Sequence, residues 1–155
     1  MADRVRMLLV EDDPVFAAVV RRAVERHGWA VRRVTDASEA LRALEEELPD
    51  VLLTDYLLPG ANGGALAAEV LARLDRHAPL MLLMSATPDL VSDEERGRFA
   101  AVLRKPFPLD GLLSTVERLL EARRAQVPAS GPRLRAGVTD GVGDASARGR
   151  RPPVR

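Results

Sequence analysis

The chain has 155 residues, the size of one ordinary domain, and its 23 Lys and Arg residues balance its 23 Asp and Glu residues. The absence of cysteine excludes a disulfide framework and thiolate metal sites, and no apolar run reaches the ~18 residues of a membrane span. With no net charge to attract nucleic acid or membrane, and with acids too near the N-terminus for a signal peptide, we expect a cytoplasmic protein with neither of these partners.

Short apolar runs alternate with amphipathic segments along most of the chain, which is typical of strands alternating with helices. In chain order the predicted strand–helix pairs are 5–10 with 14–28, 29–34 with 36–48, 51–54 with 67–74, 80–84 with 89–96, and 99–103 with 109–120. Asp13 and Pro14 suit the cap and first residue of a helix, and Asp36 with Glu39 has capping-box spacing. The stretch PGANGG, residues 59–64, predicts a turn.

Five strands that alternate with five helices predict an α/β fold with a parallel sheet covered by helices on both faces. Because crossovers between parallel strands are right-handed, we expect a doubly wound five-stranded sheet with the strand order 2-1-3-4-5. The apolar run VLLT at 51–54 is typical of a central strand that is buried on both faces.

Residues 125–155 differ in composition from the rest of the chain. They are rich in Arg, Gly and Pro and contain no aromatic residue. Such a segment cannot bury enough apolar surface to offset the entropy that is lost on ordering. We therefore predict one domain over residues 4–124 and a disordered tail over residues 125–155.

Polar and charged side chains follow the predicted strands at their carboxyl ends. They are Glu11, Asp12 and Asp13 after the first strand, Asp55 and Tyr56 after the third, Ser85 after the fourth and Lys105 after the fifth. In an open parallel sheet these ends share one edge, and ligands bind there near the point at which the strand order reverses. We therefore expect the acids, the hydroxyl and the ammonium to form one site, although they are far apart in the sequence.

The residue types at this edge predict phosphoryl chemistry around a divalent cation. Clustered carboxylates repel one another unless a cation offsets them, and Mg²⁺ takes such oxygen ligands while it bridges to phosphate. An Asp carboxylate is itself a nucleophile that can accept a phosphoryl group. Lys105 is the only lysine among 23 basic residues, and its compact ammonium suits a tight carboxylate–phosphate site better than a planar guanidinium does.

These residues resemble the receiver domain of two-component response regulators. The matching stretches are LLVEDDP, DVLLTDYLLPGANGG, MLLMSA and VLRKPF, in the order and spacing of that family, and the resemblance covers about residues 4–124. The resemblance implies the (βα)5 fold, flavodoxin-like and CheY-like, and a bacterial phosphoprotein of phosphorelay signal transduction.

The resemblance also implies which residues bind phosphate and metal. Asp55 would be the phosphoacceptor and a ligand of Mg²⁺. Asp12 would bind the cation directly, Glu11 would assist through water, and the backbone carbonyl of Leu57 would be a further ligand.

Other positions would respond to the phosphate. Ser85 would take the place of the switch hydroxyl, which is more often a threonine, and Lys105 would pair first with the phosphoacceptor and then with its phosphate. A cis bond would precede Pro106, and Gly63 would hold the turn before the third helix. Val102 stands where many members carry Tyr or Phe, so we expect output to use a movement other than an aromatic rotamer switch.

The function implied is that of a single-domain response regulator, because no second globular domain is predicted. It would take its phosphoryl group from a sensor histidine kinase or a phosphotransfer protein. It would then signal to an unknown downstream protein target through phosphorylation-dependent contacts. As a catalyst it would act only on its own phosphorylation and dephosphorylation.

Three other functions fit these residues less well. A phosphohydrolase of the haloacid-dehalogenase type needs a general acid, usually an Asp two residues after its nucleophile, and Leu57 stands there. A flavin-binding flavodoxin needs a loop rich in Ser, Thr and Gly after its first strand, where this chain has EDDP. A degenerate receiver that acts as a constitutive interaction module would lack a required side chain, and all of them are present.

Overall fold

The computed structural model describes residues 4–126. By its internal contacts the chain divides into two units, residues 1–119 and 120–155, and the described part of the second unit, residues 120–126, is the end of one helix. The predicted boundary between domain and tail, after residue 124, stays a prediction. Residues 127–155 of the predicted tail lie outside the described residues.

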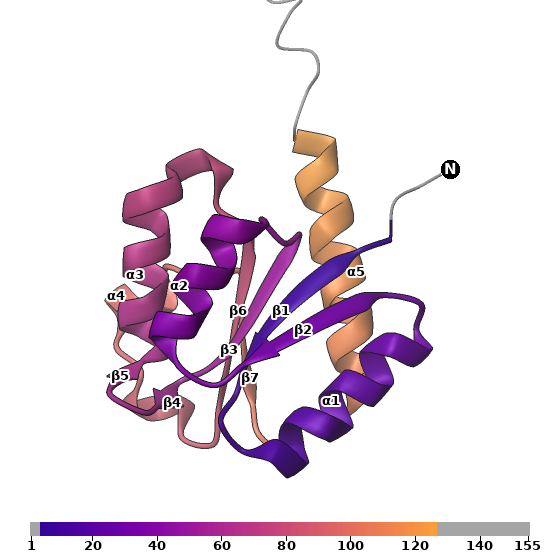
Figure 1. Ribbon diagram of the computed structural model, residues 1–155, viewed down its shortest axis with the longest axis horizontal. Coiled ribbons are helices and arrows are strands. Elements are labelled where there is room, and N and C mark those ends of the chain that lie inside the picture. The colour runs from indigo at the N-terminus through magenta and orange to yellow at the C-terminus, as the bar shows by residue number, and fades with distance from the viewer. Residues whose placement is uncertain (1–3, 127–155) are drawn as a thin grey trace, which may run out of the picture. The chain divides into compact units, whose positions relative to one another are not determined.

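Five parallel strands form the central sheet of the first unit (Figure 1). They are β1 (Arg6–Val10), β2 (Ala30–Val34), β3 (Val51–Asp55), β6 (Leu80–Ser85) and β7 (Ala101–Arg104). Their order, β2-β1-β3-β6-β7, is the predicted order 2-1-3-4-5, so the doubly wound α/β fold is confirmed. The central strand β3 is buried along its whole length, as its apolar run predicted.

Helices and one small hairpin connect the strands, and a last helix follows β7. The helices are α1 (Pro14–Arg26), α2 (Ala37–Glu46), α3 (Gly63–Leu74), α4 (Asp93–Arg96) and α5 (Leu109–Gln126), with 3₁₀ turns η1 (Asp75–His77) and η2 (Pro88–Leu90). The hairpin consists of β4 (Leu57–Leu58) and β5 (Ala61–Asn62), and it includes part of the stretch that was predicted as a turn. The predicted third helix begins earlier than residue 67, directly after this hairpin.

Side-chain caps explain where the helices begin. Asp13 accepts a hydrogen bond from the N–H of Val15 at 3.0 Å and so caps α1, as its place before Pro14 predicted. Asp36 accepts the N–H of Glu39 at 2.8 Å. The second half of the predicted capping box differs, because the Glu39 carboxylate accepts the N–H of the preceding Thr35, at 2.7 Å, and not that of Asp36.

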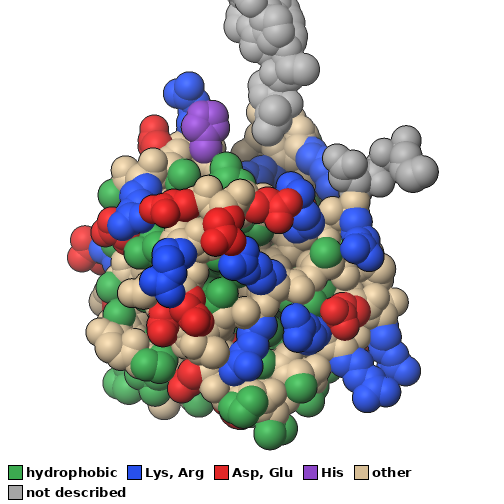
Figure 2. Space-filling view, viewed as in Figure 1, with side chains coloured by type: hydrophobic (Ala, Val, Ile, Leu, Met, Phe, Trp, Pro, Cys, Tyr) green, Lys and Arg blue, Asp and Glu red, His purple; other side chains and the backbone are tan. Residues whose placement is uncertain are grey.

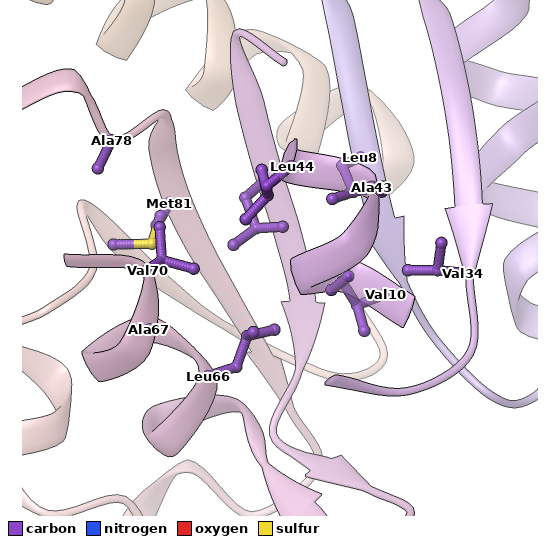
Figure 3. Packing of buried hydrophobic residues seen from close by; sticks show 12 residues of the cluster. Leu8, Val10, Val34, Ala43, Leu44, Leu66, Ala67, Val70, Ala78 and Met81 are labelled. Atoms are coloured by element: carbon purple, nitrogen blue, oxygen red, sulfur yellow. The ribbon is translucent and has the colours of Figure 1, made fainter. Parts of the chain in front are cut away.

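One face of the sheet packs against α2 and α3 (Figure 3). Because strand residues point alternately to the two faces, Leu8 and Val10 of β1 lie on this side. The helices contribute the buried side chains of Ala40, Ala43, Leu44, Leu66, Ala67 and Val70. Full burial of a Val or Leu side chain stabilises the fold by about 1.5–3 kcal/mol, so this apolar core accounts for much of the stability.

The opposite face is covered by α1 and by the part of α5 that belongs to the first unit (Figure 1). Met7 and Leu9 of β1 alternate with the residues of the other core, and both are fully buried. The buried helical side chains that do not belong to the core under α2 and α3 include Val20 and Val24 of α1 and Leu112 and Val116 of α5. The sheet is therefore covered on both sides, which leaves its edge at the carboxyl ends of the strands for polar residues.

The last strand begins later than predicted. β7 starts at Ala101 instead of residue 99, because the turns that follow α4 continue into Phe99. The N–H of Phe99 donates to the carbonyl of Arg96 at 3.0 Å, and its ring packs against the core on the side of α2 and α3. The register of β7 still brings its carboxyl end level with that of β6, because Ser85 pairs with Arg104.

Acidic and basic side chains intermingle on the surface over α2 and α3 (Figure 2). Salt bridges join Arg6 to Glu47, Arg32 to Glu46, and Arg73 to Glu45 and Glu69. Exposed pairs of this kind contribute only ~0–1 kcal/mol each, so they contribute little to holding the fold together. None of the helices formed by residues 4–126 is long and apolar enough to cross a membrane.

Candidate functional site

The strand register brings the predicted site residues to one edge of the sheet. The relevant pairs are Val10 with Thr54, Asp55 with Met84, and Ser85 with Arg104. Glu11 therefore lies level with Asp55, Ser85 lies one residue beyond it on the neighbouring strand, and Lys105 follows β7 at the same edge. Four segments of the chain meet there, as the pattern of strand ends predicted.

Lys105 lies between two carboxylates. Its Nζ is 2.9 Å from Oε1 of Glu11 and 3.2 Å from Oδ2 of Asp55. The ammonium also lies 4.3 Å from the centre of the Phe16 ring, within the range of a cation–π contact. Four-fifths of the lysine side chain is buried, since only 19% of it is exposed. The pairing of Lys105 with Asp55 was predicted from the sequence, whereas its shorter contact with Glu11 was not.

Burial and charge act against each other within this group. Burial is the largest influence on Glu11 and raises the pKa of its carboxyl, against the lowering effect of Lys105 and of the Asp13 N–H. Burial by itself would lower the pKa of Lys105, but its bonds to Glu11 and the charge of Asp55 outweigh burial and raise it. Lys105 is therefore a cation across the whole physiological range of pH.

Three carboxylates at this edge form a group that could hold a metal ion. Glu11, Asp12 and Asp55 each offer one oxygen, and these oxygens all lie within 4.8 Å of one another. An all-oxygen, anionic donor set of this size fits a hard divalent cation such as Mg²⁺. Leu57 lies in the hairpin directly after Asp55, and the role of its carbonyl as a further ligand stays a prediction.

Backbone N–H groups hold side-chain oxygens of Asp55 and Ser85 at this edge. Oδ1 of Asp55 accepts the N–H of Tyr56 at 2.9 Å. The hydroxyl oxygen of Ser85, which is buried, accepts the N–H of Thr87 at 3.0 Å. Among residues 4–126 no hydrogen bond joins the side chain of Ser85 to that of Asp55, so the two share an edge without direct contact.

Two backbone features keep the edge compact. A Cβ on Gly63 would lie 2.5 Å from the carbonyl oxygen of Asp55, so only glycine allows α3 to start this close to the end of β3. The N–H of Gly63 also donates to the carbonyl of Tyr56 at 2.7 Å. The peptide bond between Lys105 and Pro106 is cis, as the resemblance implied.

Sequence reasoning missed two residues that contact this group, Phe16 and Arg33, and a third, Glu95, that contacts the neighbouring Tyr56. Phe16 of α1 lies under the Lys105 ammonium. Arg33 of β2 donates to the backbone carbonyls of Glu11, at 3.0 Å, and Asp12, at 3.2 Å. Glu95 of α4 accepts the hydroxyl of the tyrosine that follows Asp55. Nothing in the sequence distinguishes Arg33 from the many other arginines. The contact between Tyr56 and Glu95 could not be found from the sequence either, because it depends on the fold.

Comparison with known proteins agrees with this geometry. Residues 7–117 match the response regulator receiver domain family. The DNA-binding transcriptional regulator NtrC of Escherichia coli is 34% identical over 143 residues, which are 90% of this chain and 30% of that protein. The transcriptional regulatory protein TcrA of Mycobacterium tuberculosis is 35% identical over 138 residues, 86% of this chain and 51% of that protein.

Solved structures agree on the fold. A response regulator receiver domain, CheY-like, from Methylobacillus flagellatus superposes with a TM-score of 0.70 at 22% identity. The superposition covers 75% of this chain and 98% of that domain. The chain spans about 30% of the length of NtrC and about half the length of TcrA, the two curated relatives described above.

Proposed function

The chain belongs to the response regulator receiver domain family, and we propose that it accepts a phosphoryl group on Asp55 from a sensor histidine kinase or a phosphotransfer protein. One observation carries the proposal. Asp55 ends the central strand with the Lys105 ammonium 3.2 Å from its Oδ2, and with oxygens of Glu11 and Asp12 within 4.8 Å. A nucleophile, a fixed cation and a set of metal ligands therefore meet at one carboxylate.

The transfer itself is a displacement at phosphorus. One oxygen of Asp55 attacks the phosphorus atom while the bond from phosphorus to the imidazole nitrogen of the donor breaks, and the imidazole keeps the electron pair. Mg²⁺ held by Glu11, Asp12, Asp55 and the Leu57 carbonyl would supply positive charge at the phosphoryl oxygens. The chain's own groups orient the nucleophile, because the backbone N–H of the next residue and the Lys105 ammonium each hold one of its oxygens.

Ser85 is suited to respond once the phosphoryl group is in place. Its oxygen accepts the N–H of Thr87, and a hydroxyl can accept and donate at the same time. The hydroxyl proton is therefore available to a phosphoryl oxygen, and donation would draw the loop after β6 toward Asp55. The N–H of Lys105 donates to the carbonyl of Ser85 at 2.8 Å, so this loop and the lysine move together.

The signal leaves the site by a path that needs no aromatic residue at the half-buried Val102. Tyr56 donates its N–H to Asp55 and its hydroxyl to the Glu95 carboxylate of α4, at 3.0 and 3.2 Å from the two oxygens. Glu95 also completes the capping box of α4 with Ser92. Burial and the nearby carboxylate raise the pKa of Tyr56, which keeps the phenol protonated and able to donate. A change at Asp55 therefore reaches α4 through one residue.

The output is then a change in protein contacts made by the segment from Ser85 to Lys105. The protein works in the cytoplasm, acts on a downstream protein target, and catalyses no reaction except its own phosphorylation and dephosphorylation. Its stand-alone character stays a prediction, because the relatives it matches are longer than this chain.

Phosphotransfer tests the proposal. The protein, incubated with Mg²⁺ and acetyl phosphate or a phosphorylated histidine kinase of its host, should take up phosphate as an acyl phosphate, which alkali and hydroxylamine release. Asp55→Asn should take up none, whereas Asp13→Asn, which alters only a helix cap, should label like the wild type. Equal labelling of Asp55→Asn and the wild type would contradict the proposal.

The competing functions give different results in the same assay. A phosphohydrolase would release phosphate from small phosphomonoesters over many turnovers, for which Leu57 offers no general acid. A degenerate receiver would stay unlabelled with every donor. A screen against the histidine kinases of the host would also identify the cognate partner.

A further inference from the structure

Arg33 contacts the acidic loop of the site from the neighbouring strand. β2 lies at the edge of the sheet beside β1, and Arg33 pairs in register with Leu9, two residues before Glu11 (Figure 1). Its Nε donates to the carbonyl of Glu11 at 3.0 Å and its Nη2 donates to the carbonyl of Asp12 at 3.2 Å. One guanidinium therefore binds two consecutive peptide groups of the loop that carries two of the three acids.

The geometry of this contact depends on arginine. A guanidinium presents several N–H donors in a rigid plane, so it can fix two carbonyls relative to each other. Lysine would bring the same charge as a single point on a flexible stem and could not fix both carbonyls. Within the described residues, three further hydrogen bonds restrain the backbone of this loop: the Glu11 N–H donates to the Val34 carbonyl, the Asp13 N–H donates to the Glu11 carboxylate, and the Asp13 carbonyl accepts the N–H of Ala17.

Asp12 needs such support more than its neighbours do. Glu11 and Asp55 are both held by Lys105, at 2.9 and 3.2 Å. The carboxylate of Asp12 is exposed and forms no salt bridge within residues 4–126. Its position relative to the other two acids therefore depends on the backbone of the loop, which Arg33 holds.

We propose that Arg33 is a positioning residue for the metal site, because its bonds to the Glu11 and Asp12 carbonyls hold these acids where they bind a divalent cation together with Asp55. The inference deepens the proposed function and rests on it. Arg33 has two opposite effects on cation binding. Its charge repels a divalent cation, whereas its hydrogen bonds order the ligands, and groups that orient metal ligands commonly change metal affinity by ~10–100-fold.

Two variants separate these effects. Arg33→Lys keeps the charge and loses the planar fork, and Arg33→Gln loses both. If ligand ordering dominates, both variants bind Mg²⁺ more weakly; if charge dominates, only Arg33→Gln changes, and it binds more tightly. Arg32→Gln is the matched control, since Arg32 is the adjacent residue of β2 and its guanidinium binds Glu46 of α2 at 2.8 Å, not the acidic loop.

The measurement is a Mg²⁺ titration of the full chain, without a phosphoryl donor, followed by NMR shifts of the amides at residues 11–13 and 55. We expect the Kd to rise about tenfold in both Arg33 variants, the lower end of the range for ligand-orienting groups, and to stay within about twofold of wild type in the control. Thermal unfolding in metal-free buffer measures any purely structural effect.

Several results would overturn the inference. They are an unchanged Kd in both Arg33 variants, tighter binding by Arg33→Gln, lower thermal stability with unaltered affinity, or a wild-type protein that does not bind Mg²⁺. Failure of the proposed function looks different. In that case the wild type would bind Mg²⁺ and the Arg33 variants would bind it more weakly, but no phosphate would appear on Asp55.

Discussion

Replacing Asp12 by alanine should make the metal-free protein more stable and abolish its use of Mg²⁺. The oxygens of Glu11, Asp12 and Asp55 lie within 4.8 Å of one another. At that separation two unit charges repel by about 1 kcal/mol in a water-like medium and by about 3–4 kcal/mol at an effective dielectric constant of ~20. Asp12 is exposed to water, so its repulsion from each of the other two carboxylates is about 1 kcal/mol, the lower of these values.

Two attractions that Asp12 would lose reduce the stability gained by Asp12→Ala. The nearby N-terminus of α1 favours negative charge by about 0.3–1 kcal/mol, and the Lys105 ammonium attracts all three acids. The balance leaves Asp12→Ala more stable by about 0.5–1 kcal/mol, which corresponds to a Tm higher by about 1–4 °C for a chain of this size.

Thermal unfolding with and without Mg²⁺ is the assay. Mg²⁺ at ten times its Kd should stabilise the wild type by about 1.4 kcal/mol and leave Asp12→Ala unchanged. The variant should also lose Mg²⁺-dependent phosphorylation. A lower Tm than wild type in metal-free buffer, or an equal response to Mg²⁺, would refute the reasoning about repulsion and ligands.

Three further changes have defined outcomes. Lys105→Arg should fold and take up phosphate, but its larger planar guanidinium should reduce the phosphorylation-dependent NMR shift changes of residues 85–105. Shift changes as large as those of the wild type would show that only the charge matters. Gly63→Ala should destabilise the fold by about 1–3 kcal/mol in urea unfolding, because the added Cβ would lie 2.5 Å from a backbone oxygen. Gly111→Ala in α5 is the control: its added Cβ would lie 3.8 Å from the nearest atom, so this variant should be neutral or stabilising. The backbone N–H of the α4 cap and the tyrosine hydroxyl lower the pKa of Glu95 below its ordinary 4.5, so its stabilisation is present above that pH and is lost as the pH falls through the lowered pKa. The stability difference between wild type and Glu95→Gln should accordingly shrink only below about pH 4.5, and a difference that grows there would contradict the assignment.

Much of the fold was predictable because the sheet is parallel and doubly wound. In such a fold each strand is a short apolar run and the carboxyl ends of all strands lie at the same edge, so the sequence alone predicts that Asp55 and Lys105 lie together. The late start of β7 was not predictable, because the apolar stretch FAAVL gives no sign that Phe99 packs against the core of α2 and α3. Apolar character alone does not separate a strand from the turn that leads into it.

The parts of the site that escaped prediction are contacts between distant segments. The Glu11–Lys105 pair joins residues 94 positions apart, and it depends on the register of four strands. Arg33 binds carbonyl groups, which every residue has, so no side-chain pattern signals its partner. The Tyr56–Glu95 bond depends on where a four-residue helix lies. Sequence patterns identify groups that share an edge, whereas the hydrogen bonds among them need the fold.

The central claim is that Asp55 is the residue that carries the phosphate. Its most direct test is to phosphorylate the protein with acetyl phosphate and Mg²⁺, reduce the acyl phosphate with borohydride, and locate the resulting homoserine by peptide mass spectrometry. We predict homoserine at position 55 alone, dependent on Mg²⁺ and absent from Asp55→Asn. Homoserine at Asp12 or Asp13 instead, or its absence from position 55 in a phosphorylated sample, would contradict the account.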